Sequence, residues 1–167
     1  MFRRTLLKAG VLLATGGAAS CGSRAPLANT HPSPESLAKA VLDALERRDM
    51  AALEALALGE QEFRDHIWPE LPAARPERNL PFSYVWGDLR QKSQLALRNT
   101  LSVHGGRRHA LLGVTFSRET RYANFVVHHD AALRVTSPEG PETELRVCGS
   151  MVSKSGAWKV FSYIVDN

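Results

Sequence analysis

The chain has 167 residues, two of them cysteines, and its 21 Lys and Arg against 17 Asp and Glu give a net charge of +4. Arg3, Arg4 and Lys8 stand in residues 1–20, which hold no acidic residue, so residues 21–167 carry 18 basic and 17 acidic side chains, a net charge of +1. A charge this close to zero excludes any argument from net charge for nucleic-acid binding, which uses a basic excess to meet phosphates.

Residues 1–20 have the order of a secretion signal. The basic residues come first, a modestly apolar stretch follows at 9–14, and small residues close the segment at 18–20. The apolar stretch is far shorter than the roughly 20 residues that a membrane-spanning helix needs. We therefore expect residues 1–20 to be removed as a signal peptide.

Two short motifs in this segment resemble known export signals. "FRRTLLKAG" resembles a twin-arginine signal, and "AASC" resembles the lipoprotein processing box, although Ala18 stands where Leu is usual. The resemblance implies a lipid-anchored protein of the bacterial cell envelope, acylated on Cys21 with palmitate-type chains and facing the periplasm or the cell exterior. Each buried methylene of such a chain contributes ~0.8 kcal/mol to membrane binding. An ordinary signal peptide cut nearby, which leaves Cys21 a free thiol, is the alternative.

Residues 21–35 read as a flexible tether, because Ser, Pro, Ala, Asn and Thr dominate them and no apolar periodicity is present. Residues 36–167 have the usual length of one domain and contain no internal repeat. If Cys21 carries lipid, Cys148 has no partner for an intramolecular disulfide, and stability must come from a hydrophobic core.

The first two predicted helices begin at recognisable caps. Ser33 followed by Pro34 is a helix start, and Asp49 can cap a second helix. Apolar residues then recur at helical spacing, which gives each helix one buried face. The residues on these faces are Leu37, Val41, Ala44 and Leu45 in the first helix and Leu53, Leu56 and Ala57 in the second.

Four prolines in residues 68–81 exclude both a helix and a central strand there, so we expect an ordered loop or lid. A third helix is predicted from about Leu89 to Val103, with Asp88 as its cap and Gly105 as its stop. The period then changes to two, which predicts four strands. They span residues 107–116, 121–136, 142–154 and 157–166.

Helices followed by an antiparallel sheet give an α+β fold. Within it, "ALERRDMAALEALAL" at 44–58 and "GAWKVFSYIVD" at 156–166 resemble the nuclear transport factor two-like superfamily. The resemblance implies a cystatin-like cone, in which a strongly curved antiparallel sheet wraps N-terminal helices and encloses a pocket. Steroid isomerases, SnoaL-like polyketide cyclases, dehydratases and non-catalytic domains share this fold, so the fold alone selects no function. The proline-rich residues 68–81 depart from the common pattern.

The only suggestive polar cluster is His128, His129 and Asp130. Neighbours on a strand point to opposite faces, so the two histidines cannot easily share a metal ion, and His128 with Asp130 supplies too few ligands for a structural zinc site. We therefore expect no metal and no cofactor. The sequence also lacks a CxxC motif, an HExxH motif and a glycine-rich phosphate loop.

Strand register predicts which residues surround His129. Pairing Thr136 with Glu142 places Leu133 opposite Leu145 and His129 opposite Gly149, and the next hairpin places Gly149 opposite Ser162. The resulting apolar face is the expected inside of the cone. Its predicted pocket residues are His129, Gly149, Ser162, Met151, Trp158 and Ile164. A packed core histidine is the alternative interpretation of His129.

The opposite face of the sheet mixes aromatic and polar residues, which indicates a contact surface and a homodimer through the sheet. A terminal extension or the proline-rich loop covering this face is the alternative. The residues of this face are Arg146, Cys148, Ser150, Val152, Phe161, Tyr163 and Val165.

Two functional hypotheses remain open. The first is a non-catalytic envelope lipoprotein that binds a small apolar ligand or a protein partner. The second is a small cofactor-independent isomerase, dehydratase or hydrolase that uses His129 as its acid–base group, with Ser162 and Asp166 as further candidates. Tyr84, Trp86 and Asp88 follow the proline-rich segment, and the sequence does not place them. The absence of converging acids favours the first hypothesis.

Overall fold

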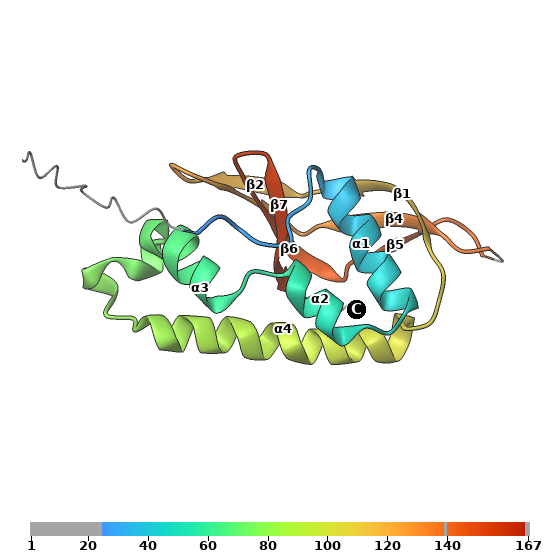
Figure 1. Ribbon diagram of the computed structural model, residues 1–167, viewed down its shortest axis with the longest axis horizontal. Coiled ribbons are helices and arrows are strands. Elements are labelled where there is room, and N and C mark those ends of the chain that lie inside the picture. Colours follow the sequence, from blue (N-terminus) through green and yellow to red (C-terminus); the bar gives the residue numbers. More distant parts are fainter. Residues whose placement is uncertain (1–24, 139, 166–167) are drawn as a thin grey trace, which may run out of the picture.

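The structure is a computed structural model and describes residues 25–138 and 140–165. Helices come first and strands follow, which confirms the α+β class. In Figure 1, α1 lies beside β1 and α2, while α4 runs along one side of the molecule against β7. The helices are α1 (Pro34–Glu46), α2 (Met50–Leu56), α3 (Glu60–Glu62) and α4 (Phe82–His104). Between α3 and α4 come a π-helical turn, η1 (Phe63–Ile67), and three 3-10 turns, η2 (Trp68–Glu70), η3 (Pro72–Ala74) and η4 (Pro76–Arg78).

The predicted caps of the first two helices are confirmed, whereas the predicted cap of the third helix, Asp88, is wrong, because that helix begins at Phe82. Ser33 Oγ accepts a hydrogen bond from Ser36 N at 3.1 Å, and Asp49 Oδ1 accepts one from Ala52 N at 2.9 Å. Each bond satisfies a backbone donor that a helix start otherwise leaves unpaired. At the other end of the helical region, Gly105 is the C-cap of α4, as predicted.

Helix α4 begins seven residues earlier than the predicted start at Leu89. The chain enters it directly from Pro81, whose fixed φ suits a helix entry, and Asp88 lies inside the helix, where it pairs with Lys92 at 2.8 Å. Residues 68–80 form short 3-10 turns, which agrees with the predicted absence of a helix or central strand. Within the described residues, no helix is both long and apolar enough to cross a membrane.

The strands form two antiparallel sheets, in the orders β1-β4-β5 and β2-β3-β6-β7. Their bounds are β1 (Ala110–Thr115), β2 (Arg118–Arg121), β3 (Val126–His129), β4 (Ala132–Thr136), β5 (Thr143–Leu145), β6 (Cys148–Lys154) and β7 (Ala157–Tyr163). The predicted strand 121–136 is thus divided at Asp130, whose φ of +52° interrupts the extended backbone. Asp130 N still donates to Gly149 O at 2.7 Å, so the chain bends there without losing its neighbour.

The predicted register is correct beyond the bend and wrong before it. Leu133 pairs with Leu145, as expected, but His129 pairs with Ser150 and not with Gly149. The bend at Asp130 and an irregularity between Cys148 and Ser150 change the phase of the alternation by one residue. A one-residue slip moves every side chain to the other face. His128 is therefore the buried histidine, at 6% exposed, and His129 is only partly buried.

Both faces of the sheet β2-β3-β6-β7 are covered by the chain itself. Met151 and Val160 join the main core with α1 and α2, while Val152 on the other face joins a second cluster with η1. The residues that we expected on one exposed face are divided between the two clusters: Cys148 and Tyr163 are buried in the main core, whereas Val152 is buried in the second cluster, where the Phe161 ring lies 6.0 Å from that of Phe63. Leu27 of the N-terminal segment and Trp68 and Leu71 of the proline-rich segment pack against the second cluster, which agrees, for the part of the face near Val152, with the alternative of cover by a terminal extension or the proline-rich loop.

The edge strand β7 is closed off by two other segments. His31 pairs with Trp158, and Leu58 N donates to Val160 O at 3.0 Å. Residues 25–31, the described beginning of the predicted tether, thus lie against the domain and form a strap. Such cover leaves β7 no open edge at these positions for pairing with another chain.

A buried ion pair joins the strap, the helices and the sheet. Lys159 is 2% exposed, and its Nζ lies 2.8 and 3.1 Å from the two carboxylate oxygens of Glu62. The same carboxylate accepts backbone hydrogen bonds from Ala28 and Gly59, each at 2.7 Å. These hydrogen bonds to the Glu62 carboxylate help to offset the free-energy cost of removing the ion pair from water.

We predict that Glu62→Ala lowers the free energy of unfolding by about 3 kcal/mol, because it leaves the Lys159 ammonium buried without a counter-charge. Chemical denaturation measures the loss. Glu60→Ala is the matched control two residues away: its ion pair with Arg64 is half exposed, and we expect a change below about 0.5 kcal/mol. Equal losses in the two variants would contradict the importance of the Glu62–Lys159 pair.

Candidate ligand-binding pocket

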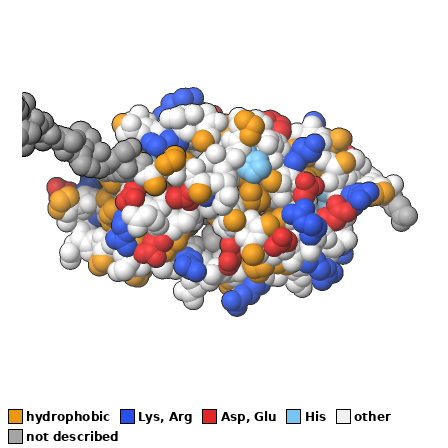
Figure 2. Space-filling view, in the orientation of Figure 1, with side chains coloured by type: hydrophobic (Ala, Val, Ile, Leu, Met, Phe, Trp, Pro, Cys, Tyr) orange, Lys and Arg blue, Asp and Glu red, His pale blue; other side chains and the backbone are white. Residues whose placement is uncertain are grey.

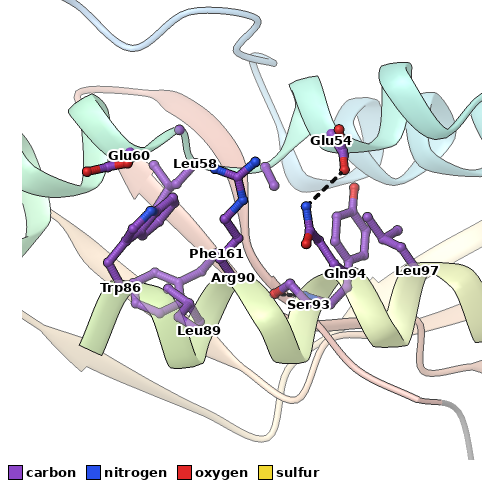
Figure 3. Close-up of a pocket in the computed structure, with 13 residues that line it drawn as sticks. Glu54, Leu58, Glu60, Trp86, Leu89, Arg90, Ser93, Gln94, Leu97 and Phe161 are labelled. Carbon is purple, nitrogen blue, oxygen red and sulfur yellow. Dashed lines mark hydrogen bonds between the residues drawn. The ribbon is translucent and has the colours of Figure 1, made fainter. Parts of the chain in front are cut away.

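A pocket of about 180 Å³ lies between α4, the connection from α2 to α3, and β7 (Figure 3). Its apolar lining comes from all three elements, and its polar groups stand at the rim and on the floor. The lining residues are Glu54, Ala57, Leu58, Gly59, Glu60, Trp86, Leu89, Arg90, Ser93, Gln94, Leu97, Phe161 and Tyr163.

One face of α4 supplies the long wall. Six of its residues recur at intervals of three or four, the spacing that brings side chains to one side of a helix. They are Trp86, Leu89, Arg90, Ser93, Gln94 and Leu97. The predicted helix, which starts at Leu89, does not include Trp86, so this stripe was not predicted from the sequence. The helical spacing of the residues from Trp86 onward was the pattern that could have predicted it, although Gly87, a poor helix former, makes a helix there less evident.

The floor of the pocket is closed by hydrogen bonds. Tyr163 donates its hydroxyl to the carbonyl of Leu53 at 2.7 Å, and its backbone N–H donates to Ser93 Oγ at 3.3 Å. Burial, with a smaller contribution from Cys148, raises the pKa of Tyr163 well above its ordinary value of 10.0. With its proton committed to Leu53, Tyr163 serves as a wall and not as an acid or base.

The rim carries the charged groups. Gln94 Nε2 donates to Glu54 Oε1 at 3.4 Å, and Glu60 pairs with Arg64 at 2.9 Å. Arg90 makes no hydrogen bond or ion pair with any residue that the structure describes. Its side chain extends from α4 across the pocket toward the α2–α3 connection (Figure 3). One guanidinium at the mouth of an apolar cavity is thus available to a ligand.

This arrangement suits binding more than proton chemistry. The apolar walls exclude water, while the rim offers a small number of orienting polar groups, which is the usual composition of a small-molecule site. No group of three or more His, Cys, Asp and Glu side chains in the described residues is placed to hold a metal ion.

The predicted pocket residues do not line this pocket, and they fall into two groups. Gly149, Ser162 and Ile164 lie together, since a side-chain carbon added at Gly149 would meet both neighbours, 3.0 Å from Ser162 Oγ and 2.5 Å from Ile164 Cγ2. Met151 and Trp158 lie with His128 in the main core. Cys21 and Asp166 fall outside the described residues.

Among the described residues, His129 hydrogen-bonds one side chain. Its Nε2 lies 2.8 Å from Thr120 Oγ1, on the adjacent strand β2. Burial, then the charge of Arg118, lowers its pKa, and Asp130 opposes this. Neither of the two cavities described here is lined by His129; the second lies against α1, α2 and the strap, where Asn29, Ala40 and Ala55 contribute to its wall.

His128 has the richer set of contacts. Its Nε2 lies 2.9 Å from Ser153 Oγ, and its Nδ1 lies 3.1 Å from Glu119 Oε1, an ion-pair distance without the alignment of a hydrogen bond. The ring stacks on Trp158, with centroids 4.4 Å apart, and lies 5.0 Å from Phe116. Uninterrupted alternation predicts His128 on the face opposite His129, and the bend at Asp130 makes that prediction wrong.

Acidic and basic side chains are interspersed over the face of the molecule in Figure 2, which shows no extended region of one sign. The described residues also form exposed ion pairs, among them Arg108–Glu46 and Arg146–Glu144. The surface in this view therefore offers no basic stripe for nucleic acid.

No protein-family model, curated protein or solved structure matches the chain.

We predict that the protein loses stability as the pH falls below about 6.5. Burial lowers the pKa of His128 from its ordinary value of 6.5, and Arg121 and His129 add to this, whereas Glu119 opposes it. Below that pH the unfolded chain binds more protons than the folded one, so the free energy of unfolding decreases. One such proton contributes at most about 1.4 kcal/mol per pH unit.

Denaturation curves between pH 7 and pH 5 measure this slope. In His128→Gln the slope should be smaller but not zero, because burial also lowers the pKa values of His31, His109 and His129. An unchanged slope in the variant would show that His128 does not contribute to the acid sensitivity.

Proposed function

We propose that the chain is a lipid-anchored protein of the bacterial cell envelope whose single domain binds a small, largely apolar ligand without catalysis. The pocket between α2, α4 and β7 carries this proposal, because its walls are apolar and one guanidinium at its mouth, that of Arg90, has no hydrogen-bond or ion-pair partner among the described residues. Acylation of Cys21 after cleavage of residues 1–20 supplies the anchor, and the twin-arginine route supplies the export.

We also propose that the domain is a nuclear transport factor two-like cone. Three observations support this: the helices precede the strands, the chain bends at Asp130 between β3 and β4, and α1 and α4 lie against the sheets. The sequence resemblance at 44–58 and 156–166 falls on α1, α2 and β7, which are elements of the core.

The ligand class follows from the lining. Trp86, Leu89 and Phe161 offer aromatic and aliphatic contact area, while Arg90 and Gln94 offer hydrogen-bond donors at the rim. A compact hydrophobic body with a carboxylate or carbonyl at one end meets both. Burial of the body supplies most of the affinity, and the head group sets the orientation.

We predict that 3-phenylpropionate binds this pocket. Titration followed by nuclear magnetic resonance should shift the amide signals of residues 86–97, and Gln94→Trp should weaken binding by about tenfold, or ~1.4 kcal/mol, because the indole occupies the mouth. Leu95→Trp is the matched control, since Leu95 is 65% exposed and does not line the pocket. The parent protein should bind 3-phenylpropionate more tightly than the neutral 3-phenylpropan-1-ol, and Arg90→Met should remove this difference in affinity.

Equal weakening by the Gln94 and Leu95 substitutions would contradict binding in this pocket. Shifts confined to other parts of the chain would do the same.

A hydrolase is the alternative, and one observation favours it. Glu119, His128 and Ser153 follow one another at 3.1 and 2.9 Å, the order of a carboxylate, a base and a hydroxyl nucleophile. It ranks second because Phe116 and Trp158 pack on the ring, and because Ser153 and His128 line neither of the two cavities described above.

A fluorophosphonate probe distinguishes the two functions. It attaches covalently to an activated serine, so a hydrolase would show an adduct on Ser153 by mass spectrometry, and Ser153→Ala would abolish it. For the binding protein that we propose, we expect no adduct in the parent or in the variant.

A further inference from the structure

The first described residues are fastened to one end of the molecule. The carbonyl of Ala25 accepts a hydrogen bond from His66 Nε2 at 2.7 Å, and Ala28 N donates to Glu62. His66 lies in η1, which leads directly into the 3-10 turns. In Figure 1 the start of the described chain, these turns and the beginning of α4 all lie at the same end of the molecule.

The proposed lipid attachment is close to this fastening in the sequence. Cys21 precedes Ala25 by four residues, which span at most ~14 Å when fully extended. From Ala25 onward the strap is fixed to the domain, because backbone groups of Ala25, Ala28 and His31 form hydrogen bonds with it. A lipid on Cys21 therefore holds this end of the domain, and not the opposite end, next to the bilayer.

The surface at this end carries side chains suited to a lipid headgroup region. Leu80 is 40% exposed and Tyr84 is 66% exposed, and Arg75 and Arg78 are exposed on the preceding turns, with one exposed acidic residue, Glu77, between them. Tyrosine is enriched at membrane interfaces, and arginine gains about 1 kcal/mol near an anionic membrane surface.

The backbone beneath these side chains is held in place. The Phe82 ring lies 5.6 Å from Trp68 and 6.0 Å from Phe63, and the Arg64 guanidinium lies 3.8 Å above its centroid. The exposed residues on either side of Phe82 are thus presented from a packed support.

We propose that residues 75–84 form a membrane-docking surface that rests on the anionic phospholipid of the bilayer to which Cys21 is anchored. This rests on the proposed acylation of Cys21. The anchor supplies attachment, and the docking surface supplies orientation, with α4 leading away from the membrane and the pocket opening beyond its first turn.

Fluorescence quenching in vesicles tests the orientation. The full acylated protein is reconstituted into vesicles of phosphatidylcholine and phosphatidylglycerol that carry a headgroup-attached quencher, with a bimane label on Tyr84→Cys or Leu95→Cys. The two positions are equally exposed, at 66% and 65%. Because they are eleven residues apart in an α-helix, they lie on the same face of α4, within about 20° of each other around its axis and ~16 Å apart along it. Burial raises the pKa of the Cys148 thiol to about 12, so that thiol stays unlabelled.

We expect the Tyr84→Cys label to be quenched several-fold more strongly than the Leu95→Cys label. Replacing Arg75 and Arg78 together by Gln should reduce quenching at position 84 and leave co-sedimentation with the vesicles unchanged. Equal quenching at the two positions, or none at either in a protein that sediments with the vesicles, overturns the docking surface and leaves the anchor standing. A parent that sediments no better than Cys21→Ser overturns the anchor and the docking surface together.

Discussion

The carboxylate of Glu62 is the point at which separate parts of the chain are joined. Burial alone would raise its pKa, but hydrogen bonds from Gly59 N, Lys159 and Ala28 N outweigh that effect and lower it, so the group stays charged. Gly59 belongs to the pocket wall, Ala28 to the strap and Lys159 to β7. One buried charge therefore sets the position of the pocket relative to the sheet and to the end of the molecule that carries the strap.

Local signals in the sequence predicted much of the fold. The caps at Ser33 and Asp49 and the stop at Gly105 depend on residues within one turn of each other, and all three were correct. The prediction of strand register was wrong where the backbone conformation depends on residues far away in the sequence. The left-handed conformation of Asp130 is stabilised by Gly149 and Ser117, which are brought to it only by the folded sheet.

The site was harder to predict than the fold. If the side chains of the predicted strand 121–136 alternated without interruption, His129 would face the core. The bend at Asp130 changes this, and His128 faces the core in its place. The pocket that exists is formed by α4 against β7 and the α2–α3 connection, segments that lie far apart in the sequence. Its helical stripe was readable once Trp86 was placed on the helix, whereas its contact with Phe161 and Tyr163 depends on tertiary packing that periodicity does not encode.

Cys148 has a consequence for when the chain folds. Its thiol is fully buried on β6, and burial raises its pKa to about 12, so almost none of it is thiolate, the form that reacts with oxidants and other thiols. Bacterial envelope compartments oxidise exposed cysteines. Under the export that we propose, an unfolded chain would present this sulfur to chance mixed disulfides, whereas a chain that crosses the membrane already folded would arrive with it shielded. For a chain exported in this way, the order of folding and translocation would decide whether Cys148 lowers the yield of the native protein.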